Sequence, residues 1–116
     1  MFIITTLLLA SMGLTVLERP ELTLTQGLLE SNLNVRAVGK AGEKGAWQVR
    51  EKYWGKVPKT FKGQADQAED ILNELLEASN GDLRVALRKY NGSGAAARKY
   101  ANKICKRTLE RCLMFV

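Results

Sequence analysis

Residues 64–79 read QADQAEDILNELLEAS and carry the clearest helical pattern in the chain. Their apolar side chains recur at spacings of three and four residues, which places them on one face of an α-helix. These positions are Ala65, Ala68, Ile71, Leu72, Leu75 and Leu76. The dipeptide Asn80-Gly81 follows and favours the left-handed conformation in which helices end. We therefore predict an amphipathic helix over residues 64–79.

Before this helix, the sequence predicts a helix, a glycine-rich loop and a second, short helix. Pro20 suits the first turn of a helix over residues 20–32, whose leucines recur at helical spacing. The stretch GKAGEKG, residues 39–45, has three glycines and predicts a loop. A short helix is expected next, with Trp47, Val49, Tyr53 and Trp54 as its larger apolar members and Gly55 and Pro58 at its end.

Two more helices are predicted after Gly81. Asp82 can cap a short helix that directs Leu83, Ala86, Leu87 and Tyr90 towards the core. After the turn NGSG comes a final amphipathic helix, whose periodic positions are Ala97, Tyr100, Ala101, Ile104, Cys105, Thr108, Leu109 and Cys112. No segment of five or more residues alternates cleanly as a half-buried strand would. We therefore predict an all-α fold.

The first 17 residues, MFIITTLLLASMGLTVL, contain no charged side chain. As a helix they would be about 25 Å long, slightly less than the roughly 30 Å of a bilayer's hydrocarbon core. Three interpretations remain open: a cleaved signal peptide, an uncleaved membrane anchor, and a core or partner-binding helix. We favour export or membrane association, although no Lys or Arg precedes the apolar run. Residues 1–17 are thus an apolar N-terminal helix or leader, and residues 18–116 are expected to form one domain.

The 116 residues include no histidine and only two cysteines. This composition excludes Ser/His/Asp and Cys/His nucleophiles, His-ligated zinc and four-thiolate metal sites. The length excludes two-domain cofactor folds, and we expect neither a metal nor a cofactor. Any hydrolytic chemistry must use carboxylates, hydroxyls or lysine. On one continuous helix the Cα atoms of Cys105 and Cys112 would lie about 10 Å apart, too far for a disulfide. Unless that helix breaks between them, we interpret both as buried thiols.

The net charge is +6, and the positive charge is concentrated late in the chain. Residues 84–107 contain eight basic side chains and no acid: Arg84, Arg88, Lys89, Arg98, Lys99, Lys103, Lys106 and Arg107. Such a tract is either a solvated helix face or a surface for nucleic acid, anionic lipid or an anionic wall polymer. Nucleic acid is not the expected partner, because the tract lacks a reading motif and its tyrosines fall at core spacing.

Glu30 ends the first leucine-rich helix, next to Leu28 and Leu29. A carboxyl in apolar surroundings tends to keep its proton and can act as a general acid, although an ordinary surface glutamate looks the same in sequence. Four segments put Glu30 in context: PELTLTQGLLESN (20–32), AGEKGAWQV (41–49), ALRKYNGS (86–93) and YANKI (100–104). Together they resemble the catalytic domain of soluble lytic transglycosylases, which has the goose-type lysozyme-like fold, over about residues 20–105. The segments WGKVP and YNGS and the small size look most like bacteriophage-encoded members.

The resemblance implies a role for each matching residue. Glu30 would be the single catalytic acid and base. The implied substrate-binding residues are Ser31, Gly45, Gln48, Tyr90, Asn91 and Tyr100. Gly42, like Gly45, would let the loop backbone approach the sugar closely. Each also has a simpler explanation as a turn, cap or core residue. Arg88 and Lys89 depart from the small residues that the family commonly has before its Tyr-Asn pair.

The implied activity is that of a peptidoglycan lytic transglycosylase, which cleaves the MurNAc-GlcNAc β-1,4 bond and leaves 1,6-anhydromuramic acid ends. Glu43 is a second carboxylate in the loop and could orient water, which would make the enzyme a hydrolytic muramidase on the same bond. A third interpretation is an inactive membrane- or virion-associated protein that binds glycan. The expected partner is the glycan strand of peptidoglycan, and the expected location is periplasmic, membrane-associated or virion-associated.

Overall fold

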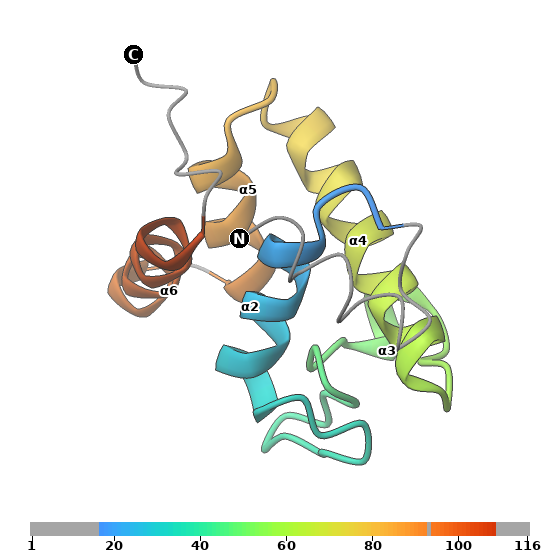
Figure 1. Ribbon diagram of the computed structural model, residues 1–116. Helices are drawn as coiled ribbons and strands as arrows, with labels where there is room; N and C mark the ends of the chain where they lie inside the picture. The colour runs from blue at the N-terminus through green and yellow to red at the C-terminus, as the bar shows by residue number, and fades with distance from the viewer. Residues whose placement is uncertain (1–16, 93, 109–116) are drawn as a thin grey trace. The chain divides into compact units, whose positions relative to one another are not determined.

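A computed structural model describes residues 17–92 and 94–108 (Figure 1). Its helices are α2 (Pro20–Ser31), α3 (Glu51–Trp54), α4 (Phe61–Ala78), α5 (Leu83–Asn91) and α6 (Gly94–Arg107). Strands are absent from these described ranges, where only isolated bridges join Lys44 to Val38 and Val49. The predicted all-α class is therefore confirmed. The lysozyme-like fold stays a prediction, and the expected helix in the leader lies outside the described residues.

The chain divides into two compact units at Glu69 and Asp70, within α4. The first unit, as far as it is described, contains α2, α3 and the start of α4, and the second contains the rest of α4 with α5 and α6. The prediction of one domain over residues 18–116 stays a prediction. In the described part of the chain, no helix combines the length and the hydropathy needed to cross a membrane.

Helix α2 begins as predicted and ends one residue earlier, at Ser31. Asn32 takes the left-handed conformation with φ of 58°, and its N–H bonds to Leu28 O at 2.9 Å. The N–H of Leu33 then bonds to Gly27 O at 3.1 Å, which satisfies a second carbonyl at the helix end. These bonds turn the chain sharply away from the helix axis directly after Glu30 and Ser31.

Helix α4 begins at Phe61, three residues before the predicted start. The reason is local, because the Thr60 hydroxyl oxygen accepts a hydrogen bond from Gly63 N at 3.0 Å and caps the first turn. At the other end the prediction is confirmed. Asn80 and Gly81 both have positive φ, and Gly81 N bonds to Leu76 O at 2.8 Å.

The predicted aromatic helix is shorter than expected, since α3 contains only residues 51–54. Trp47 lies before it in the loop and is fully buried. Its indole N–H donates to Thr23 O at 2.7 Å, and its ring meets Phe61 edge-on with centroids 5.4 Å apart. A methyl group on Gly27 would lie 2.9 Å from the indole, so only glycine allows α2 to approach so closely. Trp47 is thus the centre of the first unit's core rather than part of a helix.

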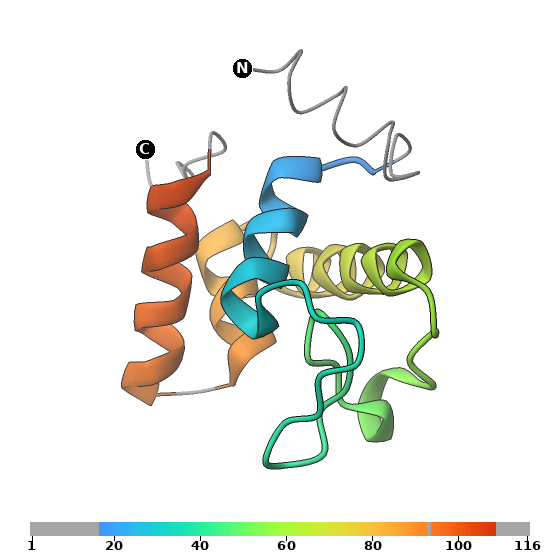
Figure 2. The ribbon, with the colours of Figure 1, turned by 60° about the horizontal axis from the view of Figure 1, so that its bottom comes forward.

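Gln64 anchors the long loop between α2 and α4, which Figure 2 shows as cyan-to-green chain folded back on itself. Its side chain is 3% exposed and makes three hydrogen bonds to backbone groups. Oε1 accepts from Ala46 N at 2.8 Å, while Nε2 donates to Val35 O at 3.1 Å and to Pro58 O at 2.8 Å. One amide therefore holds three points of the loop against α4.

Glu69 has a role that the sequence did not predict. Its two carboxylate oxygens accept hydrogen bonds from Glu18 N at 3.0 Å and Arg19 N at 2.9 Å, at the start of α2. Arg19, the N-cap residue, provides no side-chain cap of its own. A carboxylate from α4 therefore supplies the negative charge and the acceptors that a helix N-terminus favours.

In the second unit, Asp82 caps α5 as predicted, because its carboxylate accepts from Val85 N at 3.1 Å. Helices α5 and α6 pack against each other (Figure 1). The buried apolar residues that they contribute are Leu83, Ala86, Leu87, Ala97, Ala101, Ile104 and Cys105.

The interpretation of Cys105 as a free thiol is wrong, because Cys105 is disulfide-bonded. That interpretation assumed one continuous helix through residue 112, but α6 ends at Arg107 and Thr108 is not helical. The geometric objection to a disulfide therefore does not apply. Cys112, the chain's only other cysteine, lies outside the described residues.

Replacing Gln64 with alanine should lower the free energy of unfolding by about 3 kcal/mol, because buried backbone groups of the loop lose their partners. Gln67→Ala is the matched control: it lies one turn later on α4 and makes only weak bonds, to Gly55 O at 3.5 Å and Lys56 O at 3.2 Å. The control should cost less than about 1 kcal/mol. Urea denaturation followed by circular dichroism measures both, and equal losses would contradict the anchoring role of Gln64.

Candidate active site

A hydrogen bond from Ser31 fastens the end of α2 to the glycine-rich loop. Its hydroxyl donates to Ala46 O at 2.8 Å and accepts from Asn34 N at 2.9 Å. Ser31 directly follows Glu30, and Ala46 lies in the glycine-rich segment AGEKGAWQV (41–49). The structure therefore brings together two of the four segments singled out in the sequence. The hydroxyl proton of Ser31 is used within the protein, and a contact of Ser31 with glycan stays a prediction.

Left-handed backbone conformations occur within these two joined segments and directly after the first of them. Asn32, Leu33 and Gln48 have positive φ values of 58°, 62° and 50°. Among the described residues the only other non-glycine with positive φ is Asn80, at the end of α4. The left-handed conformation costs a residue with a side chain about 1–2 kcal/mol, but asparagine adopts it readily, so the strain lies at Leu33 and Gln48. Such strained residues occur preferentially at functional sites, where the surrounding structure holds them in place.

Glu30 is half-buried in the last turn of α2, directly before Ser31. The side chain has interactions of its own within the protein. Its position at the end of the first leucine-rich helix is the one expected from the sequence. Its role as the catalytic acid stays a prediction.

Gly45 is buried, with φ of 84°. A methyl group at this position would lie 2.6 Å from Gln64 Oε1. Glycine is therefore needed here for two reasons, the left-handed backbone and the close approach of Gln64. The close approach shown by the structure is to Gln64, and an approach of Gly45 to glycan stays a prediction.

The side chains of Gln48 and Glu43 both turn back onto their own loop. Gln48 Nε2 donates to Gly45 O at 3.0 Å, so the amide braces the turn. Glu43 Oε1 accepts from Ala41 N at 2.8 Å. Both residues are half-buried, which leaves part of each side chain exposed to solvent. Substrate binding by Gln48 and water activation by Glu43 stay predictions.

Tyr90, Asn91 and Tyr100 belong to the second unit. Tyr90 is half-buried in the last turn of α5, Asn91 is exposed at its end, and Tyr100 is half-buried on α6. The two tyrosines have interactions within the protein. That these three residues surround the substrate with Glu30 stays a prediction.

A shallow cavity of 270 Å³ lies beside the glycine-rich loop in the first unit, and Gly42 is the one residue singled out in the sequence for a role at the site that lines it. Its lining residues are Ala41, Gly42, Arg50, Glu51, Lys52 and Tyr53. The pKa of Glu51 is lowered below its ordinary value, first by the hydrogen bond from Val57 N at 2.8 Å and then by Lys44, whose Nζ lies at 2.9 Å. These contacts stabilise the fold above the ordinary pKa of Glu51, and the stabilisation is lost as the pH falls through the lowered value.

Two residues that hold this site together were not predicted, Gln64 and Ala46. The sequence did contain one indication that Gln64 is buried and hydrogen-bonded. It lies four residues before Ala68, on a helix stripe that is otherwise apolar. Ala46 acts through its backbone N–H and carbonyl, which any residue possesses, so its side chain carries no signal.

Within residues 17–92 and 94–108, no three His, Cys, Asp or Glu side chains group together in a way that could hold a metal ion. Comparison of the chain with protein-family models, with curated proteins and with solved structures finds no match. The resemblance to lytic transglycosylases therefore rests on the sequence segments quoted above.

Gly45→Ala should destabilise the protein more than Gly42→Ala. Both glycines have nearly the same φ, 84° and 85°, but a methyl group on Gly42 would meet nothing within 4 Å. Gly42→Ala, the control, should lower the free energy of unfolding by about 1–2 kcal/mol through backbone strain alone. Gly45→Ala should cost at least about 2 kcal/mol more, because Gln64 must move and lose hydrogen bonds. Urea denaturation of the two variants gives the difference, and equal costs would mean that Gln64 does not restrict this position.

Proposed function

We propose that the chain is a peptidoglycan lytic transglycosylase that cleaves the MurNAc-GlcNAc β-1,4 bond with Glu30 as its single acid and base. The observation that carries the proposal is the 2.8 Å hydrogen bond between Ser31 and Ala46. It joins the Glu-Ser segment to the glycine-rich segment, 15 residues apart in sequence. These are two of the segments on which the resemblance rests, and a catalytic site requires them to meet.

In the first step, the protonated Glu30 carboxyl donates its proton to the glycosidic oxygen as the C1–O bond of MurNAc breaks. Positive charge then develops at C1 and the ring oxygen, as in other glycosidic cleavages. The GlcNAc leaves with a free hydroxyl, and Glu30 remains as a carboxylate. General acid catalysis of this kind contributes roughly 10²–10⁴-fold in rate.

In the second step, the Glu30 carboxylate removes the proton from the C6 hydroxyl of the same MurNAc. The C6 oxygen attacks C1, which forms the 1,6-anhydro ring and returns Glu30 to its protonated form. Water is not consumed, so the number of atoms in the two products equals that in the substrate. This cycle requires one carboxyl and no histidine, metal or cofactor, in agreement with the composition of the chain.

A hydrolytic muramidase is the alternative on the same bond. It needs a group that activates water, and Glu43 is the carboxylate in the glycine-rich loop. The hydrogen bond from Ala41 N to Glu43 Oε1 supports the transglycosylase, because that oxygen is already engaged in the turn. An inactive protein that binds glycan is the other alternative.

The proposed setting is local opening of the cell wall by a protein in the periplasm, at the membrane or in a bacteriophage virion. The apolar residues 1–17 support association with a membrane or virion. The partner would be the glycan strand of peptidoglycan, and neither a cofactor nor nucleic acid has a place in the proposed reaction.

Glu30→Gln should lower the rate of peptidoglycan cleavage by roughly 10³-fold, because the amide cannot donate the required proton. The full-length protein is incubated with purified sacculi, and mass spectrometry of the soluble fragments measures 1,6-anhydromuramic acid ends. Glu43→Gln is the matched control, since its amide oxygen can still accept from Ala41 N. The control should keep both the rate and the anhydro product.

Retained activity in Glu30→Gln would contradict the assignment of the acid. Fragments that carry reducing-end muramic acid, and that disappear in Glu43→Gln, would establish the muramidase instead. Binding to sacculi without any release of fragments would establish the inactive glycan-binding protein.

A further inference from the structure

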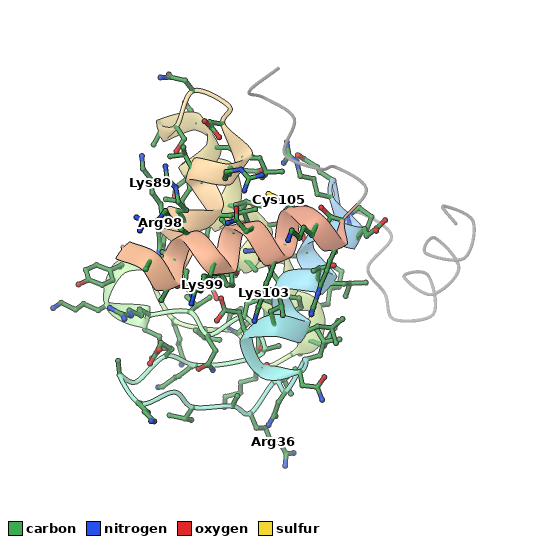
Figure 3. The ribbon with its side chains drawn as sticks, turned by 90° about the vertical axis from the view of Figure 1, so that its left-hand side faces the viewer. Arg36, Lys89, Arg98, Lys99, Lys103 and Cys105 are labelled. Carbon is green, nitrogen blue, oxygen red and sulfur yellow. The ribbon has the colours of Figure 1, made fainter. Side chains whose placement is uncertain are left out.

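Helix α6 carries five basic side chains on its exposed side. They are Arg98, Lys99, Lys103, Lys106 and Arg107, all of them exposed, and this set is called the α6 basic face. Figure 3 shows Arg98, Lys99 and Lys103 following one another along the helix. The buried positions of the same helix are Ala97, Ala101, Ile104 and Cys105. The cations thus occupy the side of α6 that the core of the second unit does not use.

The charges of the α6 basic face are not neutralised within the described residues. None of its five side chains forms an ion pair or a hydrogen bond there, and residues 83–108 contain no acid. In the first unit, carboxylates lie among the basic residues in sequence, and two of these, Lys44 and Lys62, each pair with a carboxylate at 2.9 Å. The α6 basic face is therefore a local surplus of positive charge.

The requirements of the helix itself do not explain this surplus. Lys106 and Arg107 lie in the last turn, where cations interact favourably with the helix dipole. Lys99, Lys103 and Arg107 follow at spacings of four residues, at which like charges repel each other. An anionic partner along the helix would remove that repulsion.

We propose that the α6 basic face binds the surface of an anionic phospholipid membrane. Each basic side chain near such a surface raises the partition constant roughly fivefold. Stable peripheral attachment generally needs two signals, and a hydrophobic segment combined with a basic patch is one such pair. Residues 1–17 are apolar and uncharged in sequence, so the chain contains both. The α6 basic face would hold the protein at the membrane surface.

Lipid is favoured over nucleic acid by the residues between the cations. The other exposed positions of α6 are Gly94, Ala95, Ala96 and Asn102, which are short. No bulky exposed side chain of α6 itself therefore separates its cations from a flat surface. Single-stranded nucleic acid is bound by stacking its bases on exposed aromatic rings. The one aromatic residue of α6, Tyr100, is half-buried.

The test measures partition of the full-length chain onto phosphatidylcholine vesicles with and without phosphatidylglycerol. The triple variant Lys99→Gln, Lys103→Gln, Arg107→Gln should bind the anionic vesicles about 100-fold more weakly than the unaltered chain. Its binding to neutral vesicles should not change. The matched control is Arg36→Gln, Lys40→Gln, Lys59→Gln, which removes the same charge from exposed positions of the first unit. Its affinity for anionic vesicles should fall by less than about fivefold.

Circular dichroism checks that α6 remains folded. If the triple variant unfolds, the double variant Lys99→Gln, Lys103→Gln takes its place, because it leaves the last turn of α6 unchanged. Its affinity for anionic vesicles should be about 25-fold lower than that of the unaltered chain. Equal losses in the triple variant and its control, or equal binding to both kinds of vesicle, would overturn the proposal. So would salt-sensitive binding of duplex DNA that the triple variant loses while vesicle binding is kept. The vesicles contain no glycan, so the result is independent of the proposed enzymatic activity.

Discussion

The first unit depends on the hydrogen bonds that the buried side-chain amide of Gln64 makes to backbone groups. The loop between α2 and α4 has almost no regular structure, so its backbone polar groups need partners from elsewhere. Gln64 supplies partners to Val35, Ala46 and Pro58. Because its oxygen lies against Gly45, a residue with a side chain cannot replace that glycine without moving the amide. The position of the glycine-rich loop thus follows from one side chain on α4.

Helix α2 is held at both ends by residues that are distant in sequence. Glu69 binds the N–H groups at its start, and Ser31 binds the carbonyl of Ala46 at its end. Between these two ends the indole of Trp47 packs on Gly27 and donates to Thr23 O. These contacts fix the backbone of Glu30, which lies in the last turn of this helix. In the proposed reaction, this would position the proton donor before substrate binds.

The helices could be predicted because their signals are local. The apolar stripe of α4, the Asp82 cap and the Asn80-Gly81 stop each act within a few residues, and each appears in the structure. The predictions were wrong where contacts between residues distant in sequence, or the early end of a helix, override the helical periodicity. Trp47 lies in a loop because Thr23 and Phe61 bind it there. Cys105 is in a disulfide, which the end of α6 at Arg107 permits.

The sequence by itself determined the all-α class, most helix ends, the surplus of positive charge and the absence of histidine chemistry. These properties follow from composition and from spacing along one helix. Only the tertiary structure decided that Gln64 anchors the loop, that Glu69 caps α2 and that Ser31 joins Glu30's helix to Ala46. The physical reason is that a buried polar side chain must find a partner, and which partner it finds depends on where the folded chain places distant backbone groups.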